Sequence, residues 1–242
     1  MAASAKIIDL RKLLAERFPH PAVTTATHLF TDLPFLDQPT GGGLPRGAIT
    51  ELISPARSAT HSVAGGPRTS AGSASLIHAF IRGAYRDNYF VALIDGHDSF
   101  DPCGLDNVLL QHLFWIRCSK ASETIKAADL LLRDGNFPLV IVDLVLNAPA
   151  ELRKIPQTTW YRLQRLVELI PAACLVLTRY KMVGSAQLKL VLENSWNLES
   201  LEKQDAISQL RIVVKRSHLQ PEVGHLRYLA TASQGSQRSE VG

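Results

Sequence analysis

Short apolar runs alternate with amphipathic segments along most of the chain, and this alternation constrains the fold more than any other feature. A strand that is apolar along its whole length has to be covered on both faces, as strands are in a parallel sheet between helices. The sequence therefore predicts an α/β fold with a mostly parallel sheet flanked by helices. The predicted strands are 48–54, 89–96, 112–118, 138–146 and 172–180, and the predicted helices are 73–87, 122–135 and 158–170.

Turn-forming residues and helix signals divide the chain into three parts. Residues 1–40 are predicted to be an N-terminal helix, with helical spacing over 5–17, and a linker rich in Pro, Thr and Gly. Residues 41–231 form the predicted core, which closes with an antiparallel hairpin made by "LRIVVKR" and "HLRYLAT". Residues 232–242 are predicted to be a disordered tail. The helix over 122–135 is expected to be capped by Ser122 and ended by Gly135.

The composition is that of a folded protein of a reducing compartment. Apolar residues make up 46% of the 242 residues, which is enough for a core. The three cysteines have no CxxC spacing, and two of them, Cys118 and Cys174, lie in apolar runs, which favours buried free thiols. No stretch reaches the length of a membrane span, and the N-terminus is charged and amphipathic rather than a signal peptide. We therefore expect a cytoplasmic protein with no membrane contact.

Positive charge is concentrated in one part of the chain. Residues 152–192 contain seven bases and one acid, Glu168, and this leaves 19 of the 26 bases and 21 of the 22 acids elsewhere. A local excess of this kind suits an acidic partner, although a solvated helix face would look the same. The seven bases are Arg153, Lys154, Arg162, Arg165, Arg179, Lys181 and Lys189.

Three acids stand within or at the ends of predicted strands, namely Glu51, Asp95 and Asp143. Ligands of open parallel sheets bind beyond the carboxyl ends of the strands, and an acid after a large apolar run is a common ligand of nucleotide-bound Mg²⁺. The alternative is that each acid organises a turn or caps a helix.

The stretch "AGGPRTSAGSAS" (64–75) lies between the first predicted strand and the first core helix, where a phosphate-binding loop would lie. It has the glycines and hydroxyl groups of such a loop but no lysine.

From Gly41 to about Lys215 the chain resembles the RecA-type recombinase core. "GGGLPRGAITELIS" looks like the entry strand of that family, and "VALIDGHDSFDP" is similar to its second strand and turn. "PLVIVDLVL" resembles the strand that carries the metal-binding acid, which falls on Asp143. The resemblance implies a RecA-like fold.

The departures from the family pattern concern the chemistry. The resemblance places Ser73 and Ala74 where the family has the Lys that neutralises the phosphates and the Thr that binds Mg²⁺. The catalytic Glu of the family falls on His97. The loop is therefore interpreted as the remnant of a nucleotide site, consisting of Gly66, Gly72, Ser73, Ser75 and Asp143. We expect no ATP turnover, no catalytic residue, and no required cofactor or metal; weak binding of ATP, with Mg²⁺ on Asp143, stays open.

The family binds DNA through two loops, which correspond here to the short "NAPAELRKIPQ" and "YKMVGSAQ". Four basic residues on the segments that leave the carboxyl edge of the sheet, Arg153, Lys154, Arg179 and Lys181, are predicted to lie together on one face and to contact a partner protein or DNA. Trp160 and Tyr161 are interpreted as core residues rather than stacking platforms, so any DNA binding should be weak and non-specific.

Within the RecA-like proteins, a short chain with a degraded ATP site resembles the ImuA group of SOS mutagenesis accessory proteins. That resemblance implies a scaffold in error-prone translesion synthesis. Its implied partners are RecA, an ImuB-like relative of Y-family polymerases, and an error-prone C-family polymerase. Two alternatives remain: an active ATPase that uses Arg57 or Arg68 in place of the lysine, and a sensor that binds nucleotide without turnover.

Overall fold

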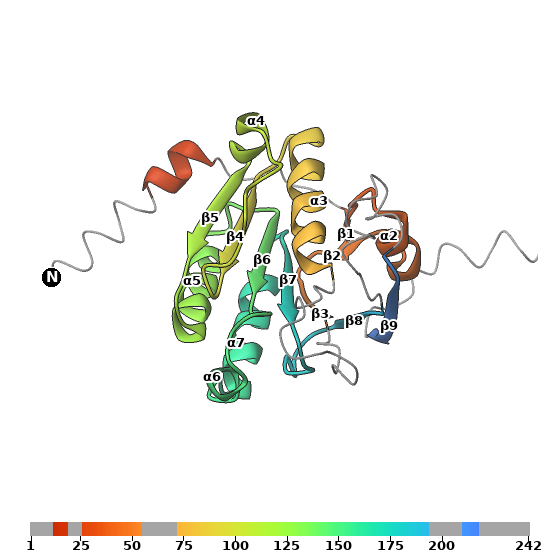
Figure 1. Ribbon diagram of the computed structural model, residues 1–242, viewed down its shortest axis with the longest axis vertical. Helices are drawn as coiled ribbons and strands as arrows, with labels where there is room; N and C mark the ends of the chain where they lie inside the picture. Colours follow the sequence, from red (N-terminus) through yellow and green to blue (C-terminus); the bar gives the residue numbers. More distant parts are fainter. Residues whose placement is uncertain (1–11, 19–25, 55–71, 194–209, 218–242) are drawn as a thin grey trace, which may run out of the picture.

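A seven-stranded sheet runs through the molecule in the order β5-β4-β6-β7-β3-β8-β9 (Figure 1). The computed structural model describes residues 12–18, 26–54, 72–193 and 210–217. Neighbouring strands are parallel except β8 and β9, which are antiparallel. The predicted α/β fold is therefore confirmed. The strands are β3 (Ala48–Ile53), β4 (Val91–Asp95), β5 (Leu113–Arg117), β6 (Leu139–Asp143), β7 (Ala173–Thr178), β8 (Leu188–Leu192) and β9 (Ile212–Ser217).

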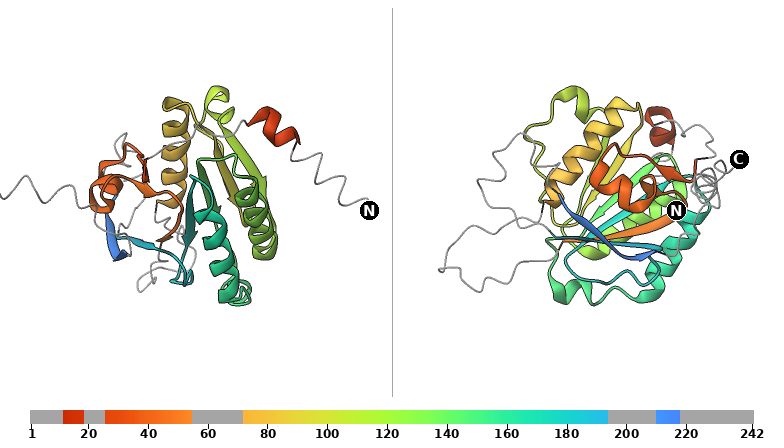
Figure 2. Two further views of the ribbon diagram at one scale, coloured as in Figure 1. Left: turned by 180° about the vertical axis from the view of Figure 1, so that it is seen from behind. Right: turned by 90° about the vertical axis from the view of Figure 1, so that its right-hand side faces the viewer.

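The central strands send alternate side chains into two hydrophobic cores, one on each face of the sheet. In β6, Leu139 and Ile141 belong to one core and Val140 and Val142 to the other, because successive strand side chains point to opposite faces. The first core is covered by α3 (Ser73–Arg86), and the second by α5 (Ala121–Asp134) and α7 (Gln157–Glu168). Figures 1 and 2 show these helices on opposite sides of the sheet. The continuous apolar runs in the sequence follow from this double burial.

Helix α5 begins without the predicted side-chain cap. Its N-cap is Lys120, so Ser122 lies inside the first turn and the predicted cap is wrong. The N–H of Ala121 instead donates to the Glu151 carboxylate at 2.8 Å, so a distant acid replaces the local cap. Gly135 ends the helix in the left-handed conformation, with φ 74°, as predicted.

Strand β6 is shorter than predicted and ends at Asp143. The Asp143 side chain accepts a hydrogen bond from the N–H of Val145 at 2.9 Å. This bond bends the chain out of the sheet, although the apolar run continues to Leu146.

Some elements were not predicted. Helix α2 (Pro34–Thr40) lies inside the expected linker. Pro34 occupies its first turn, Gly41 ends it with φ 79°, and its Leu36 side chain is buried in the core. Prolines that indicate turns in a sequence are also accepted at the start of a helix. The other elements are the short strands β1 (His28–Leu29) and β2 (Leu44–Pro45) and the short helices α4 (Asn107–Leu110) and α6 (Pro149–Leu152).

The antiparallel strand pair at the C-terminal end is present, but one of its two strands is not the one predicted. The described partner of β9 is β8, a strand that was not predicted. The other predicted hairpin arm, 225–231, and the predicted disordered tail lie outside the described residues.

The N-terminal segment packs against the second core. Residues 12–17 are helical, and the side chains of Leu14 and Phe18 are buried. The Phe18 ring lies 5.0 Å from Phe90 and 5.2 Å from Phe114, measured between ring centroids. Among the described helices, none has the length and apolar character needed to cross a membrane.

Candidate functional site

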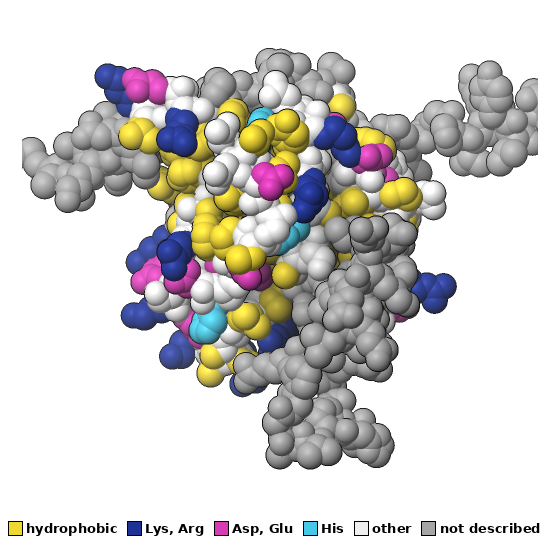
Figure 3. All heavy atoms as spheres, turned by 45° about the horizontal axis from the view of Figure 1, so that its top comes forward, with side chains coloured by type: hydrophobic (Ala, Val, Ile, Leu, Met, Phe, Trp, Pro, Cys, Tyr) yellow, Lys and Arg dark blue, Asp and Glu magenta, His cyan; other side chains and the backbone are white. Residues whose placement is uncertain are grey.

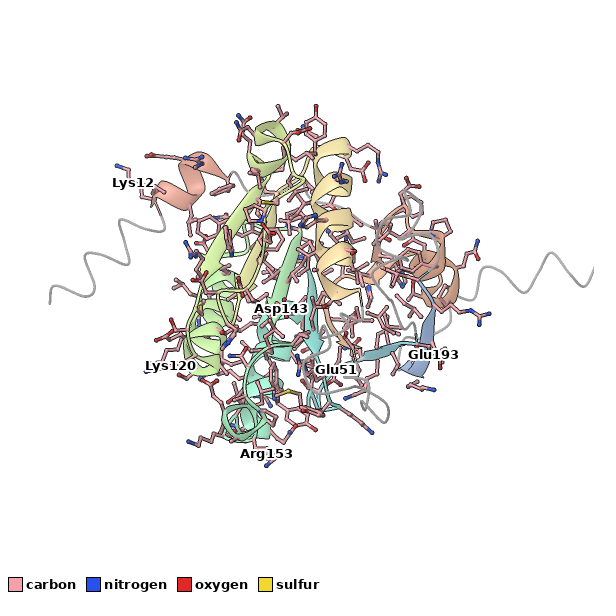
Figure 4. The ribbon with its side chains drawn as sticks, in the orientation of Figure 1. Lys12, Glu51, Lys120, Asp143, Arg153 and Glu193 are labelled. Carbon is pink, nitrogen blue, oxygen red and sulfur yellow. The ribbon has the colours of Figure 1, made fainter. Side chains whose placement is uncertain are left out.

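The carboxyl ends of the parallel strands bring the three predicted acids to one edge of the sheet. In the strand register Asp95 is paired with Asp143, and Asp143 with Leu177. Glu51 lies two strands further along, in β3. Figure 4 shows Glu51 and Asp143 in the lower half of the sheet, toward which the strand arrows of Figure 1 point. The three carboxylates share this edge, but their surroundings differ.

Glu51 is fully buried and holds the loop that follows β7. Its carboxylate forms an ion pair with the Lys189 ammonium, with Nζ 2.6 Å from Oε2. The other oxygen, Oε1, accepts the N–H groups of Met182 at 2.6 Å and Val183 at 2.8 Å. The Lys189 ammonium also donates to the carbonyl of Val183. Glu51 is therefore a structural anchor, so the structural alternative, and not a role as a metal ligand, describes this acid.

Asp95 is also buried and shapes the turn after β4. Its carboxylate accepts the N–H groups of Ser99 at 2.7 Å, Phe100 at 2.8 Å and His97 at 3.2 Å. These bonds use both oxygens, so the turn-forming alternative describes Asp95. The side chain of His97 is exposed on this turn.

Asp143 differs from the other two acids in its surroundings. Its side chain is half-buried and, among the described residues, accepts a hydrogen bond from the Val145 N–H. Burial raises the pKa of Asp143 to about 6; the Val145 bond lowers this pKa, the Asp95 charge raises it, and the positive charge of Arg179 lowers it. Arg179 and Asp143 therefore share one electrostatic environment at the strand ends.

The predicted remnant of the phosphate loop is only partly described. Gly72 precedes α3 with φ 84°, Ser73 is buried in the first turn, and Ser75 is half-buried. Gly66 lies outside the described residues, as do Arg57 and Arg68. Among the described elements, α3 follows β3 in the chain, as predicted. The described first turn of α3 carries Ser73 and Ala74 and no cationic side chain.

Two of the four predicted interface residues, Arg153 and Lys181, line a groove of about 450 Å³ between the α6–α7 segment and the loop after β7. Lys154 is exposed beside Arg153, and Figure 4 shows Arg153 at the lower end of the molecule. Arg179 lies closer to Asp143 and is half-buried. The groove is also lined by Pro149, Leu152, Ile155, Gln157, Tyr180 and Met182.

Some of the seven bases of residues 152–192 are already paired with acids. Lys189 is buried and paired with Glu51, and Arg162 forms an ion pair with Asp129 at 3.1 Å. The expectation for the aromatic pair is half right, because Trp160 is fully buried whereas the Tyr161 side chain is 56% exposed. A lysine within the apolar run "LKLVL" is the sequence signal that could have indicated a buried ion pair.

Gln157 is a further residue that sequence reasoning missed. Its side-chain amide donates to the Met182 carbonyl at 3.0 Å and accepts the Gly184 N–H at 3.2 Å. A side-chain β-carbon at position 184 would lie 2.5 Å from the Gln157 oxygen, so a larger residue there would displace the end of the Gln157 side chain. In the described part of the chain, no three His, Cys, Asp or Glu residues come together as a metal-binding group.

Comparison with known proteins supports the fold but no narrower assignment. No protein-family model matches the chain, and no curated protein sequence matches it. The solved crystal structure of the RadB recombinase is similar, with a TM-score of 0.55 and 19% sequence identity, over 80% of this chain and 92% of that chain. The chain therefore has the RecA-like fold.

Proposed function

We propose that this protein is a non-catalytic RecA-like accessory protein in DNA damage tolerance. The observation that carries the proposal is the first turn of α3, where Ser73 and Ala74 stand in place of the lysine and threonine that the RecA-type phosphate loop uses. Each charge-assisted hydrogen bond contributes about 1.5–3 kcal/mol, so loss of the lysine alone weakens triphosphate binding by roughly ten- to a hundredfold. Glu51 and Asp95, which are engaged elsewhere, add no metal ligand.

In this proposal the protein is a cytoplasmic scaffold in SOS-induced, error-prone translesion synthesis, as in the ImuA group. Its partners are RecA, an ImuB-like relative of Y-family polymerases, and an error-prone C-family polymerase complex. The supporting feature is the basic edge that contains Arg153, Lys154, Arg179 and Lys181. Direct DNA binding is weak and non-specific, with a Kd of about 10⁻⁴–10⁻⁶ M at physiological salt.

The test combines ATP hydrolysis with partner capture. The purified protein should hydrolyse ATP no faster than background, with or without single-stranded DNA. RecA or the ImuB-like subunit should co-purify with it, and Arg179→Glu combined with Lys181→Glu should abolish this while circular dichroism stays unchanged. ATP turnover that disappears in Asp143→Ala would contradict the proposal, as would wild-type partner yield with the double variant.

Asp143 supports a second candidate, a RecA-like nucleotide sensor. It lies at the end of β6 in the electrostatic environment of Arg179, where a magnesium ion and a phosphate could be balanced. A sensor would show a rise in Tm with ATP and Mg²⁺, without hydrolysis. That rise would be lost in Asp143→Asn.

A further inference from the structure

The groove between α6–α7 and the loop after β7 combines an apolar floor with a basic rim. Leu152 is buried, and Ile155 and Met182 are half-buried. Arg153 and Lys181 are exposed on opposite sides of it. The volume of about 450 Å³ is that of a ligand pocket, which accommodates a few side chains rather than an extended polymer.

The walls of the groove are held in place before any ligand arrives. From the sheet side, Glu51 accepts the N–H groups of Met182 and Val183 and is itself paired with Lys189. From the helix side, Gln157 binds the Met182 carbonyl and the Gly184 N–H. A preformed site avoids the entropic cost of ordering a loop on binding, so even a small groove can bind usefully.

The positive charge of the rim is available to a ligand. Glu151, the acid of α6, points away to the start of α5, where it accepts the Ala121 N–H at 2.8 Å. The described residues give neither Arg153 nor Lys181 an ion-pair partner. The opposite edge of the sheet differs, because there Arg86 is paired with Asp32 and Asp87. Figure 3, in which the top of Figure 1 is turned toward the viewer, shows basic and acidic side chains close together among apolar ones.

We propose that this groove binds a peptide segment of a partner protein in which an apolar side chain is flanked by carboxylates. The apolar side chain would fill the floor over Ile155 and Met182, and the carboxylates would pair with Arg153 and Lys181. The exposed ring of Tyr180, beside Lys181, adds amphipathic contact area. A single strand of DNA fits less well, because such sites need a basic groove that tracks several phosphates and a row of stacking platforms.

The inference rests on the proposed role as a binding protein, but it is tested without any assumption about which protein the partner is. A displayed library of short random peptides is selected on the immobilised full chain, and selected peptides are measured by fluorescence anisotropy. We expect enrichment of peptides with Asp or Glu on both sides of Leu, Ile or Phe. Arg153→Glu combined with Lys181→Glu should weaken their binding by about tenfold or more. Lys181→Arg should retain it, and Ile155→Ala should weaken it, with some loss of Tm because Ile155 also packs against the second core.

The matched control reverses two exposed lysines elsewhere, Lys12→Glu with Lys126→Glu, and should bind the selected peptides like the wild type. Failure to enrich any peptide, enrichment of basic or uncharged peptides, or equal loss of binding in the control would overturn the proposal. So would an oligodeoxythymidylate that displaces every selected peptide and binds more tightly. If peptides bind as expected but RecA and the polymerase relatives do not co-purify, the groove assignment stands and the proposed function fails.

Discussion

Three carboxylates at one edge of the sheet differ because each meets different neighbours. Glu51 has a buried cation and two N–H donors, and Asp95 has three N–H donors. Asp143 has the Val145 N–H and a partly desolvated charge. Residue type and position in the strand do not separate these roles, since hydrogen-bond donors and opposite charges decide whether a buried carboxylate is stable as an anion.

Asp143 should make stability depend on pH. Its pKa rises from 3.8 to about 6 in the folded protein, mainly because of burial. The folded state holds the proton more tightly, so the stabilisation is present below the unfolded pKa and is lost as pH rises through about 6. Asp143→Asn should therefore be as stable as the wild type near acidic pH and more stable, by at most about 2–3 kcal/mol, at neutral pH.

Urea unfolding of both proteins at acidic and neutral pH measures this difference. Asp143→Glu, which keeps the charge, is the control and should show a pH dependence like that of the wild type. A marked destabilisation of Asp143→Asn at neutral pH would show that the folded protein uses the negative charge.

The pair formed by Glu51 and Lys189 should behave as a unit. Lys189→Met leaves a buried carboxylate without its cation and should cost about 3–5 kcal/mol of unfolding free energy. Adding Glu51→Gln should recover part of this loss, because no charge remains and the amide oxygen still accepts the Met182 and Val183 N–H groups. Urea unfolding of the two single variants and the double variant gives the coupling energy. Lys126→Met, at an exposed position, is the control and should change the free energy of unfolding by less than about 0.5 kcal/mol. A change as small as this in Lys189→Met would contradict the coupling.

At the scale of elements, the loop after β7 is positioned by β3 on one side and by α7 on the other. Gln157→Ala removes the α7 contact and should cost about 1 kcal/mol. Hydrogen exchange at the Gly184 amide should then become faster, because that amide donates to Gln157. The amides of Met182 and Val183 should stay protected, since Glu51 accepts them. Thr158→Ala, at the neighbouring exposed position of α7, is the matched control; unchanged exchange at Gly184 in Gln157→Ala would contradict the role of this contact.

The whole molecule places binding features at one edge because parallel strands all end there. Asp143, Arg179 and the groove between α6–α7 and the β7 loop lie on this side of the sheet, although their residues come from separate strands and helices. The sheet beneath them is packed on both faces by hydrophobic cores. Under the proposed function, the RecA-like framework would serve as a support for partner contacts at this edge.

The sequence by itself determined the class of fold and most of its elements. Continuous apolar runs predicted β3, β4, β5, β6 and β7, and helical spacing predicted α3, α5 and α7, because both patterns are set by how nearby side chains are buried. Gly135 was predicted from a different local rule, because glycine readily adopts the left-handed conformation that ends a helix. The resemblance to the RecA core also predicts that nucleotide chemistry depends on Ser73, Ala74 and Asp143, and this stays a prediction.

Only the tertiary structure decided which distant residues meet. Glu51 and Lys189 are 138 positions apart, and they meet because β3 and β8 are neighbours in the sheet. Three other features depend on strand order in the same way: the contact of Gln157 with Gly184, the Glu151 bond to the start of α5, and the groove between α6–α7 and the loop after β7. Local periodicity carries no information about that order, since it records burial along one segment and not the partner that provides it.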